Sequence, residues 1–126
     1  MRVISVEELL GIHRIMSERY GTSHLVRDIS LVESAVYSIN ATFGGEELYP
    51  GVLQKCSRLA FALISNHAFV DGNKRIGVLA MLVMLEMSSV KHSLTNDDII
   101  AIGMGVARGE MEYEDILYLL RERCEL

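Results

Sequence analysis

The 126-residue sequence contains one proline, no tryptophan and two cysteines. With half of its residues hydrophobic, this scarcity of proline argues against long disordered segments and predicts one compact domain over residues 1–126. Cys56 and Cys124 form no CxxC pair and are too few for a disulfide framework. The sequence therefore suits a reducing, cytoplasmic environment.

The sequence also lacks three features that would direct it to other partners. No run is rich in Lys and Arg and the formal net charge is −5, which argues against direct binding of nucleic acid. The longest uncharged apolar run, IGVLAMLVML, is too short to cross a bilayer. The opening MRVISVEELL carries early carboxylates and does not resemble a signal peptide. We therefore expect no membrane partner.

Hydrophobic periodicity predicts an all-α fold of about six helices. The expected helical segments are residues 5–21, 30–43, 51–66, 73–87, 95–109 and 113–124. The end of the third segment and most of the fourth are apolar nearly all round, so both should be central. A short flap loop or hairpin is expected near residues 42–49, where two glycines and a proline interrupt the pattern.

Local signals set the expected helix ends. Ser5 with Glu8, and Ser30 with Glu33, have the spacing of capping boxes. Pro50 suits the first position of the third helix. Further along the chain, Thr95 is the expected cap of the fifth helix, and Gly21 and Gly109 are expected stops.

The stretch NHAFVDGNKRIG, residues 66–77, joins the two most apolar helices. Lys74 and Arg75 lie in the first turn of the fourth helix, where cations are disfavoured unless an anion binds there. Helix N-terminal N–H groups, these two cations and the Asn73 amide would together suit a phosphate chain. Asp71 could hold magnesium, and His67 could accept a proton from an attacking hydroxyl.

Gly72 permits a turn that other residues resist and lets the backbone approach a ligand. The Walker pattern GxxxxGK(S/T) is absent. Together, the chemical groups of residues 67–75 indicate phosphoryl or nucleotidyl transfer. Each residue also has a plainer reading: His67 as a helix C-cap, Asp71 as an N-cap, and Lys74 and Arg75 as solvated side chains.

HAFVDGNKRIG resembles the signature loop of the Fic/Doc family, HxFx(D/E)GN(G/K)R. The chain also resembles the death-on-curing (Doc) toxin branch in two further segments, FGGEELYP and RDISLVESAV, and in its overall length. The resemblance therefore covers nearly the whole chain. It implies that His67 is the base, Asp71 the Mg²⁺ ligand and Phe69 the loop anchor. Gly72, Asn73 and Arg75 would form the phosphate-binding site, with Lys74 adding a cation.

The departures from the AMP-transferring Fic pattern concern two positions. Such proteins carry glycine where this chain has Lys74, and a second arginine where it has Val78. Both changes resemble the Doc branch, which is associated with phosphate transfer from a nucleoside triphosphate, bound in reversed orientation, to a threonine of elongation factor Tu. The resemblance thus implies a toxin that uses Mg²⁺ and ATP and arrests translation. Two smaller differences are Ala68 for the family proline and Ser65 for a basic residue common in Doc-like chains. AMP transfer, or a catalytically silent partner-binding role, remains an alternative.

The resemblance also implies a flap and a control mechanism. Phe43, Gly44 and Gly45 resemble the family flap that helps place the target segment. No glutamate is followed by glycine or asparagine, so the inhibitory pattern (S/T)xxxE(G/N) is absent. We therefore expect a separate antitoxin whose segment folds into an apolar groove, with polar or acidic side chains near Lys74 and Arg75.

The other histidines have plain expectations. His13 lies on the apolar face of the first helix and should be a hydrogen-bonded, partly buried residue rather than a functional one. His24 and His92 are expected on surface loops. The methionines should fill the core.

Overall fold

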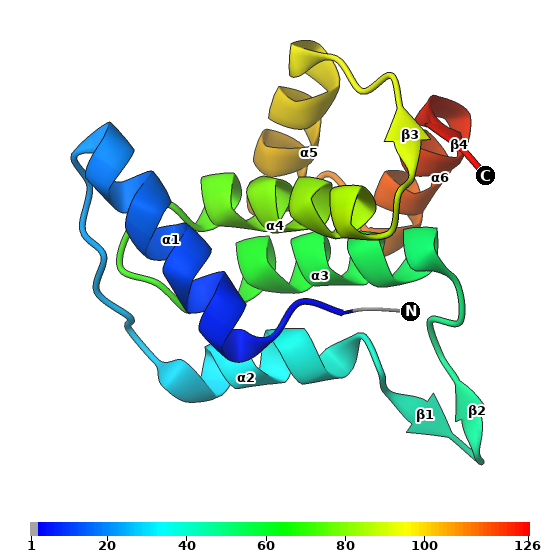
Figure 1. Cartoon of the computed structure of the whole chain (residues 1–126), viewed down its shortest axis with the longest axis horizontal. Coiled ribbons are helices and arrows are strands. Elements are labelled where there is room, and N and C mark those ends of the chain that lie inside the picture. The colour runs from blue at the N-terminus through cyan, green and yellow to red at the C-terminus, as the bar shows by residue number, and fades with distance from the viewer. Residues whose placement is uncertain (1–2) are drawn as a thin grey trace.

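A computed structural model describes residues 3–126, and its architecture is all-α as expected (Figure 1). Residues 1–2 of the N-terminal segment considered above lie outside the described part. The helices are α1 Val6–Tyr20, α2 Ile29–Ser38, α3 Val52–Asn66, α4 Asn73–Met87, α5 Asn96–Ala107 and α6 Tyr113–Arg123. Two small antiparallel pairs join β1 Thr42–Phe43 to β2 Glu46–Glu47, and β3 Lys91–His92 to β4 Cys124–Glu125. The second pair was not expected.

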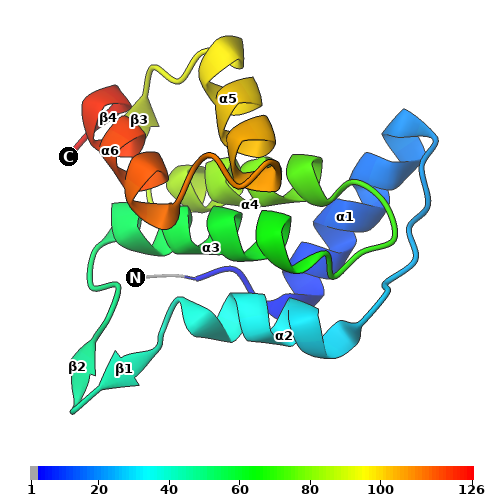
Figure 2. The ribbon, with the colours of Figure 1, turned by 180° about the vertical axis from the view of Figure 1, so that it is seen from behind.

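Helices α3 and α4 form the centre of the molecule. They run side by side in opposite directions, with α2 and α6 packed on α3, and α1 and α5 packed on α4 (Figures 1 and 2). Gly77 lets the two helices approach, because a Cβ there would lie 2.5 Å from Ile64 Cγ1 and 3.1 Å from the Ala60 carbonyl oxygen. Close packing of this pair fixes the position of the loop, residues 67–72, that connects them.

Most of the predicted helix ends are confirmed. Ser5 and Glu8 form the expected capping box on α1, and Gly21 ends that helix in the left-handed conformation. Thr95 caps α5 and forms a second box with Asp98. These ends depend on neighbouring residues alone, which is why the sequence reveals them.

The start and end of α2 differ from the prediction. Its N-cap is Asp28 rather than Ser30: the Asp28 carboxylate accepts the backbone N–H and the hydroxyl of Ser30, at 3.0 and 2.6 Å. These hydrogen bonds lower the pKa of Asp28. The helix ends at Ser38, five residues early, because the chain then turns into the hairpin, where the Ala41 carbonyl accepts Leu48 N–H.

The hairpin of β1 and β2 is confirmed. Gly44 and Gly45 both have positive φ, as a tight two-residue hairpin turn requires. Pro50 does not begin α3: Gly51 is the N-cap, in an extended conformation, and the helix starts at Val52. The hairpin meets the N-terminal end of α3, where the buried Lys55 ammonium binds Glu47 at 2.9 Å.

No helix in residues 3–126 is long and apolar enough to span a membrane.

Candidate active site

The loop of residues 67–72 is held from one side by α1. The His13 ring is buried and stacks on Phe69, with centroids 3.8 Å apart and planes 17° apart. Its Nε2–H donates to the Asp71 carbonyl at 2.9 Å, which places the proton on Nε2. Burial lowers the pKa of His13 despite this hydrogen bond and so favours the neutral ring. His13 is hydrogen-bonded as expected but is buried fully rather than partly, and its partners make it a support of the loop.

The segment of residues 23–28 holds the loop from a second side. Val26 and Phe69 form an isolated antiparallel bridge. The Ala68 carbonyl accepts the N–H groups of both Arg27 and Asp28, at 2.8 and 3.1 Å. Figures 1 and 2 both show the α1–α2 connection passing beside the α3–α4 loop. The loop is therefore fixed by backbone as well as side-chain contacts.

His67 is the C-cap residue of α3 and its side chain is exposed. Its φ of 53° lies in the left-handed region, which costs a residue other than glycine about 1–2 kcal/mol. The plainer interpretation of His67 as a helix C-cap thus describes its backbone. The exposed imidazole is still accessible to a reactant, so the two readings are compatible.

Asp71 and Gly72 form the turn into α4. One Asp71 carboxylate oxygen, Oδ2, accepts the Ser23 N–H at 3.3 Å, and the residue is exposed. Gly72, with φ 78°, is the N-cap of α4; a Cβ there would lie 2.7 Å from Met16 Cε. Asp71 is thus not the helix cap. No group of three or more His, Cys, Asp or Glu able to hold a metal exists within residues 3–126.

The Asn73 side chain binds the backbone of the loop. Its Oδ1 accepts the Phe69 N–H at 3.1 Å, and its Nδ2 donates to the Phe69 carbonyl at 2.9 Å. The side-chain amide therefore closes the loop upon itself with its oxygen and one of its two N–H donors. The second Nδ2–H and the backbone N–H at the start of α4 are the donors that Asn73 retains for an anion.

Lys74 and Arg75 are exposed in the first turn of α4, whose N-cap offers no side-chain hydrogen bond. The Arg75 guanidinium carbon lies over the Tyr20 ring, 4.4 Å from its centroid. No carboxylate lies within 4.0 Å of either cation among the described residues. A ring holds a guanidinium through its face and leaves the N–H edge available to an anion.

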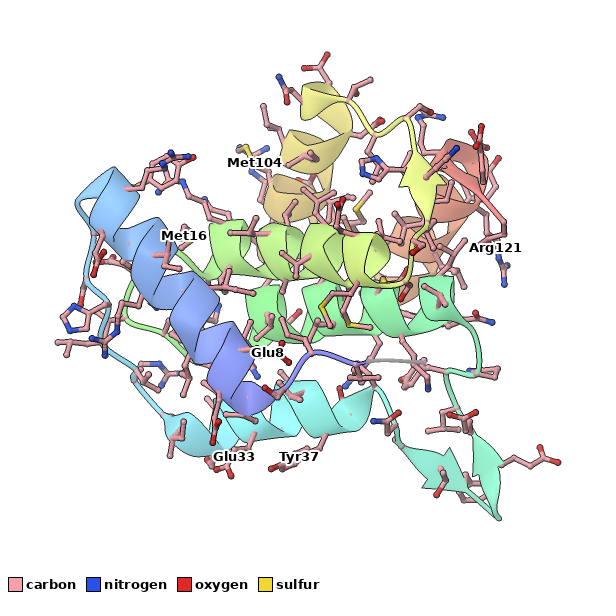
Figure 3. The ribbon with its side chains drawn as sticks, in the orientation of Figure 1. Glu8, Met16, Glu33, Tyr37, Met104 and Arg121 are labelled. Carbon is pink, nitrogen blue, oxygen red and sulfur yellow. The ribbon has the colours of Figure 1, made fainter. Side chains whose placement is uncertain are left out.

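These two cations stand at the rim of an apolar groove of about 380 Å³ between α1, α4 and α5. Met16 from α1 and Met104 from α5 flank it, as the side chains in Figure 3 show. The groove is lined by Met16, Tyr20, Lys74, Arg75, Val78, Leu79, Leu82, Ile99, Ile100, Gly103 and Met104. Two methionines expected to fill the core therefore also line this surface, although Met81 and Met84 are buried.

The structure brings His67, Asp71, Gly72, Lys74 and Arg75 into one short loop and helix start, but not the hairpin. Phe43, Gly44 and Gly45 lie at the opposite end of α3, a 15-residue helix about 22 Å long (Figure 1). The structure therefore does not bring the hairpin, which is expected to help place the target segment, to the loop. The segment beside the loop is instead residues 23–28. His24 and His92 are exposed, as expected.

The loop lies within a segment that matches a known protein family. Residues 3–85 match the model described as the Fic/DOC family, which is about two thirds of the chain. The chain belongs to the Fic/DOC family. The match contains α1 to α3, the loop and most of α4, so the Fic/DOC signature coincides with the observed helix–loop–helix.

Two relatives in this family are Doc proteins. The chain is 38% identical to Toxin Doc of Mycolicibacterium smegmatis over 72 residues, which is 57% of this chain and 55% of that protein. It is 26% identical to Protein kinase doc of Escherichia phage P1 over 121 residues, which is 96% of this chain and 94% of that protein. The resemblance to the Doc branch is thereby confirmed.

Proposed function

We propose that this chain is the toxin of a toxin–antitoxin pair and transfers the terminal phosphate of ATP to a protein hydroxyl. The observation that carries the proposal is one hydrogen-bonded loop with an exposed histidine at its start and, at its end, a cationic helix N-terminus that no side chain caps. The names of the relatives, Toxin Doc and Protein kinase doc, agree with it.

The proposed reaction assigns one step to each group. His67 accepts the proton of the target hydroxyl as that oxygen forms a bond to the terminal phosphorus, a contribution of about 10²–10⁴-fold. The bond between phosphorus and the bridging oxygen breaks, and ADP leaves. The first N–H groups of α4, Lys74 and Arg75 stabilise the phosphate charge throughout.

Magnesium fits the Asp71 carboxylate. Mg²⁺ in nucleotide sites is commonly bound by one or two carboxylates together with phosphate oxygens and water. Asp71 is exposed, and of its two carboxylate oxygens only Oδ2 accepts a hydrogen bond within the described residues. When bound there, the ion would neutralise phosphate charge.

Terminal phosphate transfer is favoured over AMP transfer by two positions. Lys74 supplies an exposed cation where AMP-transferring Fic proteins have glycine. Val78, where those proteins have a second arginine, is buried and lines the apolar groove. A phosphate clamp at this position is therefore missing. The proposed target is a protein of the translation machinery such as elongation factor Tu.

The test is to incubate the protein with Mg²⁺ and a bacterial cytosolic extract. ATP labelled on the terminal phosphate should pass label to a protein, and ATP labelled on the α-phosphate should not. Label from the α-phosphate alone would establish the AMP-transferase alternative. No label from either would leave the partner-binding alternative.

Two variants tie the transfer to the loop. His67→Ala and Asp71→Ala should abolish label transfer and growth inhibition while the circular dichroism spectrum stays native, because both side chains are exposed. His92→Ala and Asp97→Ala, at exposed positions outside the loop, are matched controls. A folded, toxic His67→Ala variant would refute the catalytic assignment.

The apolar groove supports inhibition of this chain by a separate protein. We propose that an antitoxin segment, disordered when free, folds as a helix into the groove and directs acidic or polar side chains at Lys74 and Arg75. Expression of the chain alone should stop growth, and expression with the neighbouring small open reading frame should restore it. Harmless expression alone, with full label transfer in vitro, would contradict this control.

A further inference from the structure

The C-terminus of α3 is capped by a residue from elsewhere in the chain. A helix end leaves its last carbonyls without intrahelical partners, and the last turn of α3 carries no basic side chain of its own. Arg27, before α2, fills this place. Its Nε–H donates to the His67 carbonyl at 2.6 Å, and its Nη2 donates to the Asn66 carbonyl at 3.1 Å.

These bonds act on the backbone torsion that orients His67. The direction of a carbonyl is set by the ψ angle of its own residue, so a donor on the His67 carbonyl restrains the ψ of His67. That restraint matters because the residue is held in the left-handed conformation, at φ 53°. On the other side of the peptide, the Asn66 side chain accepts Ala68 N–H and donates to the Leu31 carbonyl.

We propose that Arg27 is a positioning residue for His67: its guanidinium bridges two successive carbonyls and fixes the histidine in the orientation used for proton transfer. This inference rests on the proposed role of His67. The neighbouring Asp28 caps the start of α2, so the Arg27–Asp28 pair caps two helices at once and couples α2 to the end of α3.

The phosphate side of the loop has separate anchors. His13 binds the Asp71 carbonyl, and the Asn73 amide closes on Phe69. Loss of Arg27 should therefore disturb proton transfer and leave nucleotide binding nearly intact. A planar fork is also needed to bridge two carbonyls, so lysine should replace arginine only in part.

The experiment compares Arg27→Met and Arg27→Lys with wild type in label transfer from terminal-phosphate-labelled ATP to cytosolic proteins. Arg121→Met is the matched control, because Arg121 is exposed on α6 and far from α1 in Figure 3. Arg27→Met should lower the apparent kcat about 10–100-fold and change the KM for ATP less than about twofold. Arg27→Lys should be intermediate, and millimolar guanidinium should partly restore Arg27→Gly.

Amide hydrogen exchange gives a readout independent of activity. In Arg27→Met, the Ala68 N–H should exchange about tenfold faster, while amides of α6 are unchanged. An unchanged kcat, or equal losses in kcat with lysine and methionine and no guanidinium rescue, would overturn the positioning role. If wild type transfers no label, the proposed function fails, and the exchange of Ala68 alone decides whether Arg27 holds this backbone.

Discussion

The Asn73 side chain has two possible roles, phosphate binding and support of the loop, and a substitution distinguishes them. If its side chain served only to bind phosphate, its removal would leave the unliganded protein as stable as before. In the structure both ends of the amide bind the Phe69 backbone, at 3.1 and 2.9 Å. Asn73→Ala should therefore destabilise the protein even without nucleotide.

The size of this loss follows from the two hydrogen bonds. Each contributes about 0.5–1.5 kcal/mol net, and a backbone N–H left buried without a partner costs about 1–3 kcal/mol. Phe69 is buried, so water replaces the lost partner poorly. We expect the free energy of unfolding to fall by about 2 kcal/mol, against a typical domain stability of about 5–15 kcal/mol.

The assay is urea denaturation followed by circular dichroism at 222 nm, without nucleotide. Asn40→Ala is the control, because Asn40 is exposed and its side chain makes no hydrogen bond within the described residues. Asn73→Asp should also destabilise, since it keeps the acceptor for Phe69 N–H and places a carboxylate against the Phe69 carbonyl. A loss below about 0.5 kcal/mol for Asn73→Ala would refute the structural reading.

Three further predictions concern other contacts. Tyr20→Leu should weaken ATP binding about two- to fivefold in titration calorimetry, and Tyr20→Phe should not, because the ring face holds the guanidinium above it; equal losses in both would contradict this. Burial raises the pKa of the Cys56 thiol to about 12. Above pH ~9 only the unfolded thiol ionises, so the free energy of unfolding should fall by up to about 1.4 kcal/mol per pH unit until pH ~12. The same slope in Cys56→Ala would exclude this cause. Glu47→Gln should lower stability by about 1–2 kcal/mol in urea, because the buried Lys55 ammonium loses its carboxylate, whereas Glu46→Gln should not.

Features set by neighbouring residues could be predicted from the sequence. The box at Ser5, the cap at Thr95, the stop at Gly21 and the turn at Gly44 and Gly45 all follow from interactions within four residues. The number of helices followed from periodicity for the same reason. His67 to Arg75 are also consecutive in the sequence, so their proximity in the loop and the start of α4 could be predicted without knowledge of distant contacts.

The sequence was a poorer guide where contacts between distant segments determine the structure. Ser30 was the expected N-cap of α2, and Asp28 takes that position in the structure. Asp28 is held extended, with φ −153°, while its N–H bonds the Ala68 carbonyl forty residues away. The hairpin is expected to help place the target segment because it resembles the family flap before the central helix. The loop follows that helix, however, and a 15-residue helix separates its two ends by about 22 Å.

The residues that the sequence did not reveal share one kind of contact. His13 binds the carbonyl of Asp71, and Arg27 binds the carbonyls of Asn66 and His67. Every residue has a carbonyl, so nothing in the motif itself indicates which side chain will bind there. The motif supplies the reactive groups, and side chains outside it set the backbone that presents them. Substitutions at these outside positions should therefore alter activity although every residue of the signature is intact.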